Sequence, residues 1–181
     1  MGLVMSSIQY IFGGGEQGLD IPDKATGLTI REKRLIVNSW EQIKVNIKQN
    51  GVALFIGYFI AYPYTQDYFH KFKGKDLKQV EKSAQMRSHG TTVMHALNAL
   101  VENLDDPECL VDLLQKNAVT HFKLGIRYQQ YKELFDMFPG YLKDRIGAQC
   151  TEQTVVAWNK ATNVMLSIIE TELTKQSNVT K

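Results

Sequence analysis

Apolar residues recur every three or four positions along most of this chain, a spacing that places them on one face of an α-helix. The first such series comprises Leu35, Ile36, Trp40, Ile43 and Ile47. Thr29 and Glu32 precede it with the spacing of a capping box, in which each side chain binds the backbone N–H of the other. The pattern therefore predicts a helix that begins immediately after Thr29.

The same periodicity predicts several more helices. Pro63 suits the first position of a short helical turn, while Asp106 and Pro107 supply a helix cap and a first-turn proline. The longer helices are expected at about residues 51–62, 76–103, 107–121, 127–146 and 151–173. Since no segment shows strand-like alternation of useful length, the sequence predicts an all-α protein.

Pro139 and Gly140 conflict with this pattern, because they lie inside the helix expected at 127–146. A proline in a helix interior removes one hydrogen bond and clashes with the preceding turn, at a cost of ~3 kcal/mol. The sequence predicts either a kink or two helices there.

The two ends of the chain lack the regular pattern. Residues 1–28 contain six of the 13 glycines and show little periodicity, so we expect a flexible N-terminal extension. One globular domain is expected from residue 29 to residue 174, followed by a disordered tail at 175–181.

The composition is that of a soluble globular protein: of 181 residues, 44% are hydrophobic and 22% are charged. The net charge is +2 and basic residues are spread along the chain, so no nucleic-acid partner is expected. The longest apolar run, residues 52–62, is too short to cross a bilayer. Cys109 and Cys150 show no paired spacing and no secretion signal is visible, so we expect a cytoplasmic protein with free thiols.

Two histidines lie on apolar helix faces. His89 lies 14 residues before Asn103, and His121 lies 14 residues after Pro107. If a turn joins the two helices between those points, both imidazoles lie about 21 Å from it and face one another. Taken singly, each is more simply explained as a core histidine that is hydrogen-bonded to a carbonyl group. A zinc site would need about four protein ligands, whereas haem needs one axial imidazole because its macrocycle supplies four nitrogens.

Haem also requires an apolar slot and a cationic group for its propionates. The candidates for the walls are Phe55, Phe69, Phe72, Val93, Leu97 and Ile126. Lys71, between two of the phenylalanines, is the candidate for a propionate. Each residue alone is ordinary, and the combination is what favours haem.

The arrangement resembles the globin family from about residue 29 to residue 173. Trp40 lies where globins usually carry a tryptophan in the first helix. Pro63, Phe69 and Phe72 are similar to the family's proline, its haem-stacking phenylalanine and a second phenylalanine. The resemblance implies the three-over-three helical sandwich of a globin.

Two further motifs strengthen the resemblance. The segment HGTTV (89–93) is similar to the distal histidine and valine motif, and HFKLGI (121–126) is similar to the proximal histidine and the bend after it. Ala157-Trp158 and the interval of 32 residues between His89 and His121 resemble neuroglobin and globin X-like invertebrate globins.

The resemblance implies that non-covalent haem b (iron protoporphyrin IX) is bound, with His121 as the proximal iron ligand. His89 then either hydrogen-bonds a bound gas or itself occupies the iron, and Phe55 faces the distal cavity. The implied ligands are dioxygen, carbon monoxide and nitric oxide, and reversible gas binding is the first hypothesis. The alternative is a membrane-associated six-coordinate globin that acts in redox chemistry or signalling, namely nitrite reduction, nitric oxide dioxygenation or lipid protection, with an unidentified reductase. A third hypothesis is an interaction domain without haem, which both histidines and Phe69 disfavour.

The N-terminal sequence MGLVMS fits the N-myristoylation pattern, with Gly2 as the acceptor. Residues 1–28 contain no cysteine and one lysine against three acidic residues, so a second membrane signal is missing. A single myristoyl chain attaches only reversibly. We therefore expect either peripheral contact with the inner face of the plasma membrane or an unmodified terminus.

Overall fold

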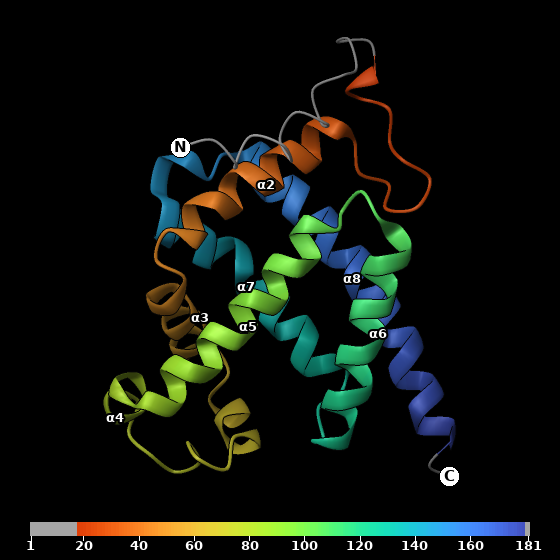
Figure 1. Cartoon of the computed structure of the whole chain (residues 1–181). Helices are drawn as coiled ribbons and strands as arrows, with labels where there is room; N and C mark the ends of the chain where they lie inside the picture. The colour runs from red at the N-terminus through yellow and green to blue at the C-terminus, as the bar shows by residue number, and fades with distance from the viewer. Residues whose placement is uncertain (1–17, 180–181) are drawn as a thin grey trace, which may run out of the picture.

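The computed structural model describes residues 18–179, which form helices joined by short turns (Figure 1). The longer helices are α2 (Ile30–Lys44), α3 (Ile47–Ala61), α5 (Ala84–Glu102), α6 (Pro107–Lys123), α7 (Tyr128–Ile146) and α8 (Glu152–Val179). The shorter elements are α4 (Leu77–Lys82) and the 3₁₀ helices η3 (Pro63–Tyr68) and η4 (Gly147–Gln149). No strand occurs within 18–179, and the all-α prediction is confirmed.

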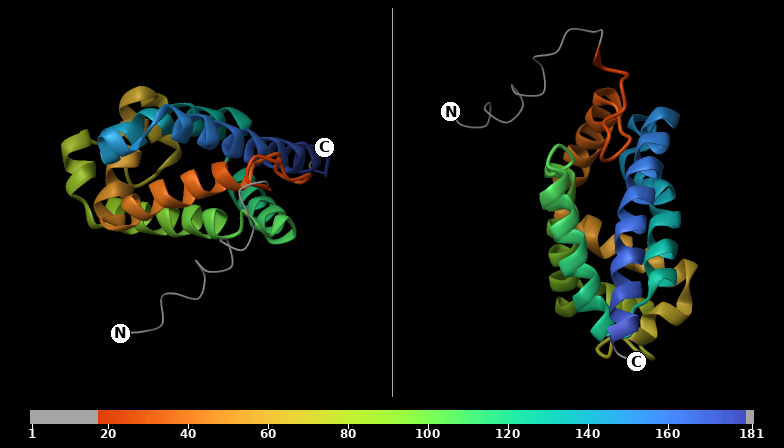
Figure 2. Two further views of the ribbon diagram at one scale, coloured as in Figure 1. Left: turned by 90° about the horizontal axis from the view of Figure 1, so that it is seen from above. Right: turned by 90° about the vertical axis from the view of Figure 1, so that its right-hand side faces the viewer.

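The long helices form two layers of three. Seen from above, α5 and α6 lie with α2 on one side, and α7 and α8 lie on the other (Figure 2). α3 belongs to the second layer and packs across α5. This is the three-over-three arrangement that the family resemblance implied.

The interior is centred on the two tryptophans, Trp40 on α2 and Trp158 on α8, whose ring centroids lie 6.0 Å apart. Each indole N–H has a partner: that of Trp40 donates to the side chain of Asn98 at 3.0 Å, and that of Trp158 donates to Ser39 at 2.8 Å. Both rings are therefore buried without an unsatisfied donor.

The crossing of α3 and α5 depends on two glycines. A Cβ atom added to Gly51 would lie 2.5 Å from the backbone of Gly90, and one added to Gly90 would lie 2.7 Å from the backbone of Gly51. The backbones of the two helices are thus in direct contact, and any side chain at either position would push them apart. This contact fixes the part of α5 that carries His89.

The predicted helix at 76–103 is two helices, which meet at Ser83. The Ser83 hydroxyl accepts a hydrogen bond from the N–H of Met86 at 3.1 Å, which caps the start of α5. It also donates to the carbonyl of Val80 at 2.7 Å, which closes α4. Serine competes with the helical backbone in this way, and hydrophobic periodicity does not reveal such a break.

Elsewhere the helices run longer than the pattern suggested. α7 continues through Pro139 as one helix, so the alternative of two separate helices is wrong. α8 extends to Val179, beyond the expected end near Leu173, so the predicted disordered tail is wrong for residues 175–179.

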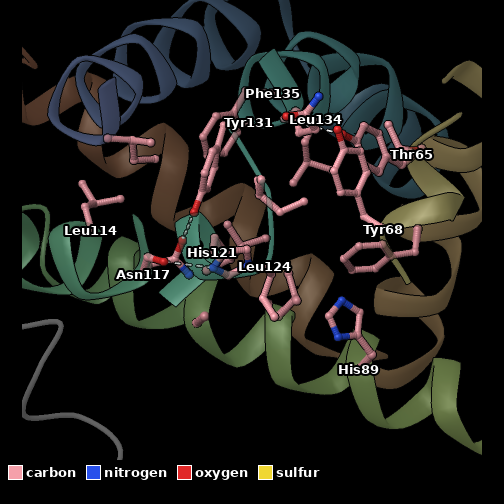
Figure 3. Close-up of a pocket in the computed structure, with 18 of the residues that line it drawn as sticks. Thr65, Tyr68, His89, Leu114, Asn117, His121, Leu124, Tyr131, Leu134 and Phe135 are labelled. Atoms are coloured by element: carbon pink, nitrogen blue, oxygen red, sulfur yellow. Dashed lines mark hydrogen bonds between the residues drawn. The ribbon is translucent and has the colours of Figure 1, made fainter. Parts of the chain in front are cut away.

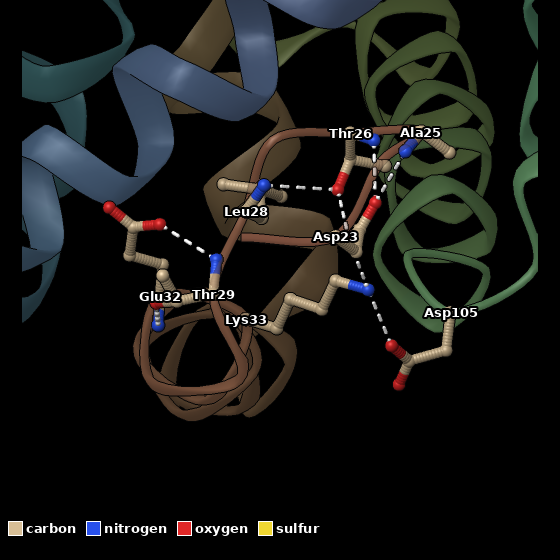
Figure 4. Close-up of polar contacts among 8 residues, drawn as sticks. All are labelled: Asp23, Ala25, Thr26, Leu28, Thr29, Glu32, Lys33 and Asp105. Carbon is tan, nitrogen blue, oxygen red and sulfur yellow. Dashed lines mark hydrogen bonds and ion pairs between the residues drawn. The ribbon is translucent and has the colours of Figure 1, made fainter. Parts of the chain in front are cut away.

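The segment before α2 also differs from expectation, since residues 18–28 were predicted to be part of the flexible extension. Leu28 is only 1% exposed, and the carbonyl of Leu19 accepts a hydrogen bond from the N–H of Arg31 at 3.1 Å. Lys33 of α2 pairs with Asp23 at 2.8 Å and with Asp105, in the turn between α5 and α6, at 2.6 Å (Figure 4). The segment is therefore fastened to two parts of the domain.

The capping box at the start of α2 is formed as the sequence predicted (Figure 4). Thr29 accepts from the N–H of Glu32 at 3.1 Å, and its own N–H donates to the Glu32 carboxylate at 2.9 Å. Gly2 lies outside the described residues. Among residues 18–179, no helix combines the length and the apolar character needed to span a bilayer.

Candidate functional site

A largely apolar cavity of about 390 Å³ lies between α5 and α6, with α7 behind it (Figure 3). This volume is within the range of cofactor and ligand sites in proteins, roughly 300–1,000 Å³. His89 reaches the cavity from α5 and His121 reaches it from α6 (Figure 3). The two helices thus present one imidazole each to the same space.

His121 is held in one tautomer. Its Nδ1 lies 3.0 Å from the backbone carbonyl of Asn117, one helical turn earlier. Since a carbonyl oxygen can only accept, Nδ1 carries the proton, and Nε2 keeps a lone pair available for a metal. Burial lowers the pKa of His121, and the hydrogen bond to Asn117 offsets this only in part. The imidazole is therefore neutral near pH 7, as an iron ligand must be.

Asn117 is itself fixed from α7. The hydroxyl of Tyr131 donates to the side-chain oxygen of Asn117 at 2.7 Å, and the ring of Tyr131 lies 5.6 Å from that of His121 (Figure 3). Tyr131 thus holds the side chain of Asn117, and the backbone carbonyl of the same residue holds His121. Hydrogen bonds of this kind orient a metal-ligating histidine and sustain its basicity.

His89 lies against two aromatic rings. Its ring centroid is 4.6 Å from that of Phe55 and 5.1 Å from that of Phe69, both in edge-on contact. Burial and the nearby His121 both lower the pKa of His89. No residue within 18–179 hydrogen-bonds the imidazole of His89, so its nitrogens are available to a group in the cavity.

Most of the residues proposed for the walls line this cavity. Phe55, Phe69, Val93, Leu97 and Ile126 border it together with the two histidines.

Phe72 and Lys71 do not line it. Phe72 is buried behind Phe69, with the two rings stacked at 5.6 Å. Lys71 is exposed beside a second, more open hollow of about 620 Å³, which Phe69 and His89 also border. Lys71 therefore lies outside the cavity, at the edge of this second hollow.

The sequence analysis missed the contribution of α7. Tyr131, Leu134 and Phe135 line the cavity from this helix, and Tyr58, Thr65 and Tyr68 line it from α3 and η3 (Figure 3). The position of Asn117, four residues before His121, is a signal in the sequence that could have indicated the contact between its carbonyl group and the imidazole. Nothing in one sequence shows which face of α7 meets that asparagine.

The residues present fit haem better than a metal held by protein ligands alone. Within the described chain, no group of three or more His, Cys, Asp or Glu residues is placed to hold a metal ion. Two neutral imidazoles on an apolar slot instead suit a cofactor that brings its own equatorial ligands.

Known proteins share this sequence and architecture. A sequence model of the globin family matches residues 52–169. A globin of Nerita albicilla is 38% identical over 150 residues, covering 83% of this chain and 96% of its own. Cytoglobin-2 of Danio rerio is 30% identical over 146 residues, covering 80% of each chain.

Two solved structures share the fold at lower identity. Ferric Aplysia limacina myoglobin superposes with a TM-score of 0.74 at 23% identity, covering 80% of this chain and 98% of its own. A hexacoordinated haem protein from an anhydrobiotic tardigrade gives 0.78 at 20% identity, covering 84% and 99%.

Proposed function

The chain belongs to the globin family, and we propose that it holds haem between α5 and α6 with His121 as the proximal iron ligand and His89 on the distal side. One observation carries this proposal: both imidazoles face the same apolar cavity, His121 with Nδ1 bound to its own helix and His89 with no protein partner among the described residues. Globins are haem proteins that bind diatomic gases, so the first function is reversible binding of dioxygen, carbon monoxide or nitric oxide.

His121 would hold the haem iron, which would supply the site that binds a diatomic gas. His121 presents Nε2 toward the cavity, and its hydrogen bond to Asn117 keeps the ring from rotating. His89, being neutral, has one N–H that can donate to the gas. Phe55 and Phe69 pack against His89 and restrict the space beside it. The apolar walls exclude water and so slow oxidation of the iron.

The proposed cofactor is haem b held without a covalent bond, in keeping with a sequence that contains no Cys-x-x-Cys-His segment for covalent attachment. Lys71 is the candidate to meet a propionate at the outer edge.

A second function is favoured by the state of His89. Its pKa is lowered by burial and by His121, and no protein group competes for its nitrogens within 18–179. These are the properties of an imidazole that can occupy the iron itself. The alternative proposal is accordingly a membrane-associated six-coordinate globin in redox chemistry or signalling, which would need a reductase partner.

The deciding experiment is the visible absorption spectrum of the reduced, gas-free holoprotein beside that of His89→Leu. Split bands that collapse to one broad band in the variant support occupation of the iron by His89, and one broad band in both supports an open site. His95→Leu is the matched control, because His95 is exposed on the same helix and does not line the cavity.

The proximal assignment is tested separately with His121→Gly. We expect this variant to take up haem weakly and to recover a histidine-like spectrum when imidazole is added. Haem uptake and a spectrum equal to those of the parent would refute the assignment.

Membrane contact through a myristoylated Gly2 is a further proposal that rests on the N-terminal motif alone. Co-expression with an N-myristoyltransferase and mass measurement of the intact chain tests it, with Gly2→Ala as the control. An unchanged mass refutes it.

A further inference from the structure

A buried carboxyl group lies close to the cavity and takes no part in the proposed gas binding. Glu133 of α7 is 7% exposed, and no ion pair involves it among residues 18–179. Its two oxygens instead accept hydrogen bonds, from the Tyr64 hydroxyl at 2.6 Å and from the Gln129 amide at 3.0 Å. The shorter length is typical of an O–H that donates to an ionised carboxylate.

Tyr64 connects this carboxylate with solvent and with the cavity wall. Its side chain lies on η3 and the residue is 45% exposed. Its ring centroid lies 6.3 Å from that of Tyr68, and Tyr68 lines the cavity (Figure 3). A single aromatic ring, that of Tyr68, therefore lies between the cavity and the partly exposed phenol of Tyr64.

Tyr64 differs from the other hydrogen-bonded tyrosines in the acceptor that it uses. Tyr58 and Tyr141 donate to backbone carbonyls, and Tyr131 donates to an asparagine oxygen. Amide oxygens do not take a proton near pH 7, whereas a carboxylate does. A phenol that loses an electron must also lose its proton. Of these four tyrosines, only Tyr64 has a proton acceptor in place.

We propose that Tyr64 is a surface oxidation site, at which a small one-electron reductant such as a phenol or an ascorbate-type enediol is oxidised by hydrogen peroxide, with Glu133 as the proton acceptor. This inference rests on the proposed haem binding, because the haem is the group that reacts with peroxide. Partial burial and the hydrogen bond to Glu133 raise the pKa of Tyr64, so the resting phenol keeps its proton.

The electrons and protons balance as follows. Tyr64 gives one electron by way of Tyr68 to the peroxide-oxidised haem, and its O–H bond breaks as the proton moves to the Glu133 carboxylate. The reductant AH then gives one electron to the Tyr64 radical, Glu133 returns the proton to the phenol oxygen, and AH releases its own proton to solvent as it becomes the radical A•. Two such transfers, with two protons from solvent, reduce one hydrogen peroxide to two waters and yield two A•.

The test uses the full-length holoprotein with its haem content checked by absorbance. The protein is mixed with hydrogen peroxide and frozen within seconds, and electron paramagnetic resonance then detects tyrosyl radicals. In parallel, a nitroso spin trap and peptide mass analysis locate the radical. We expect a tyrosyl signal and a trapped adduct at Tyr64, both lost in Tyr64→Phe.

Glu133→Gln tests the proton acceptor, because glutamine can still accept the hydrogen bond from Tyr64 but cannot take its proton. We expect this variant to lose the Tyr64 radical. We also expect the parent to oxidise guaiacol more slowly in heavy water than in ordinary water, and the variant to show no such difference. Tyr128→Phe is the matched control, since Tyr128 lies on the same helix as Glu133 and does not line the cavity.

Each outcome decides the matter. A trapped adduct on another tyrosine, or a signal that Tyr64→Phe or Glu133→Gln leaves unchanged, overturns the inference while the haem site stands. Failure to take up haem overturns the proposed function, and this inference with it.

Discussion

The contact between Gly51 and Gly90 makes a quantitative prediction about how α3 and α5 hold the distal side of the cavity. In Gly90→Ala, the new methyl group would lie 2.7 Å from one backbone atom of Gly51 and 3.0 Å from two others, one of which belongs to Val52. These neighbours are backbone atoms inside a helix and cannot rotate away. Restoring ordinary van der Waals contact requires the helices to separate by roughly 0.7 Å.

The cost can be estimated from the structure. Overfilling a packed contact costs about 1–3 kcal/mol. Replacing glycine by alanine inside a helix stabilises the folded state by about 0.5–1 kcal/mol, because alanine loses less backbone entropy on folding. Gly90→Ala is therefore expected to lower the free energy of unfolding by up to about 2.5 kcal/mol. His89 is adjacent to the new methyl group, so the same separation moves it relative to Phe55 and alters gas binding.

Gly140→Ala is the matched control for this prediction. Gly140 lies inside α7, and a Cβ atom there meets nothing within 4 Å. The gain in helix stability from replacing glycine by alanine is the same in both variants. The difference between their unfolding free energies therefore measures the steric clash alone, and we expect it to be about 1–3 kcal/mol. Urea unfolding followed by circular dichroism measures it. If Gly90→Ala proves as stable as Gly140→Ala, the inferred backbone contact is refuted.

Three further variants or conditions test other parts of the structure. Burial lowers the pKa values of both cavity histidines, so at acidic pH the unfolded chain binds protons that the folded chain excludes. The unfolding free energy of the haem-free protein is therefore expected to fall as the pH drops below about 6.5. This fall is expected to be less steep in His89→Leu. Tyr131→Phe removes the hydrogen bond to Asn117 and is expected to lower the unfolding free energy by about 1 kcal/mol. It is also expected to speed haem transfer to excess haem-free myoglobin, because Asn117 orients His121, whereas Tyr128→Phe is expected to do neither. Burial opposes ionisation of Asp23, but hydrogen bonds from Lys33 and its turn lower the pKa of Asp23 to about 2. Asp23→Asn is therefore expected to remove about 1 kcal/mol of stability at pH 7, after allowance for solvent screening, and to flatten the loss of stability that the parent shows between about pH 4 and pH 2.

Most of the long helices were predictable because they bury a regular apolar face, and the similar height of His89 and His121 was predictable because the helix rise per residue fixes it. Two other features were not predictable from the pattern, namely the competition of a side chain with the helix backbone for hydrogen bonds and the contacts between residues far apart in the sequence. Ser83 ends one helix and caps the next through its own hydroxyl, which leaves the apolar pattern unchanged. Gly51 and Gly90 are 39 positions apart in the sequence and contact each other only once α3 crosses α5.

The candidate site shows the same division. Wall residues that share a helix face with a histidine could be found by spacing, as Val93 was. Phe72 could not be separated from Phe69, because both are aromatic and only the fold shows that one lies behind the other. Tyr131 was missed for a similar reason. Its hydroxyl contacts Asn117 on the preceding helix, α6, and no spacing in the sequence shows that these two side chains meet.

α7 carries both of the polar connections that surround the cavity, yet on different faces. Tyr131 and Glu133 are two residues apart, which places their side chains about 200° apart around the helix. Tyr131 acts on His121 through Asn117, and Glu133 acts on Tyr64, so the two share no hydrogen-bond partner. We expect the double variant Tyr131→Phe/Glu133→Gln to combine the faster haem loss of the first with the lost radical of the second, and its stability change to equal the sum of the two within about 0.5 kcal/mol. If Tyr131→Phe alone abolishes the Tyr64 radical at equal haem content, the two connections are coupled and the separation argued from the faces of α7 is wrong.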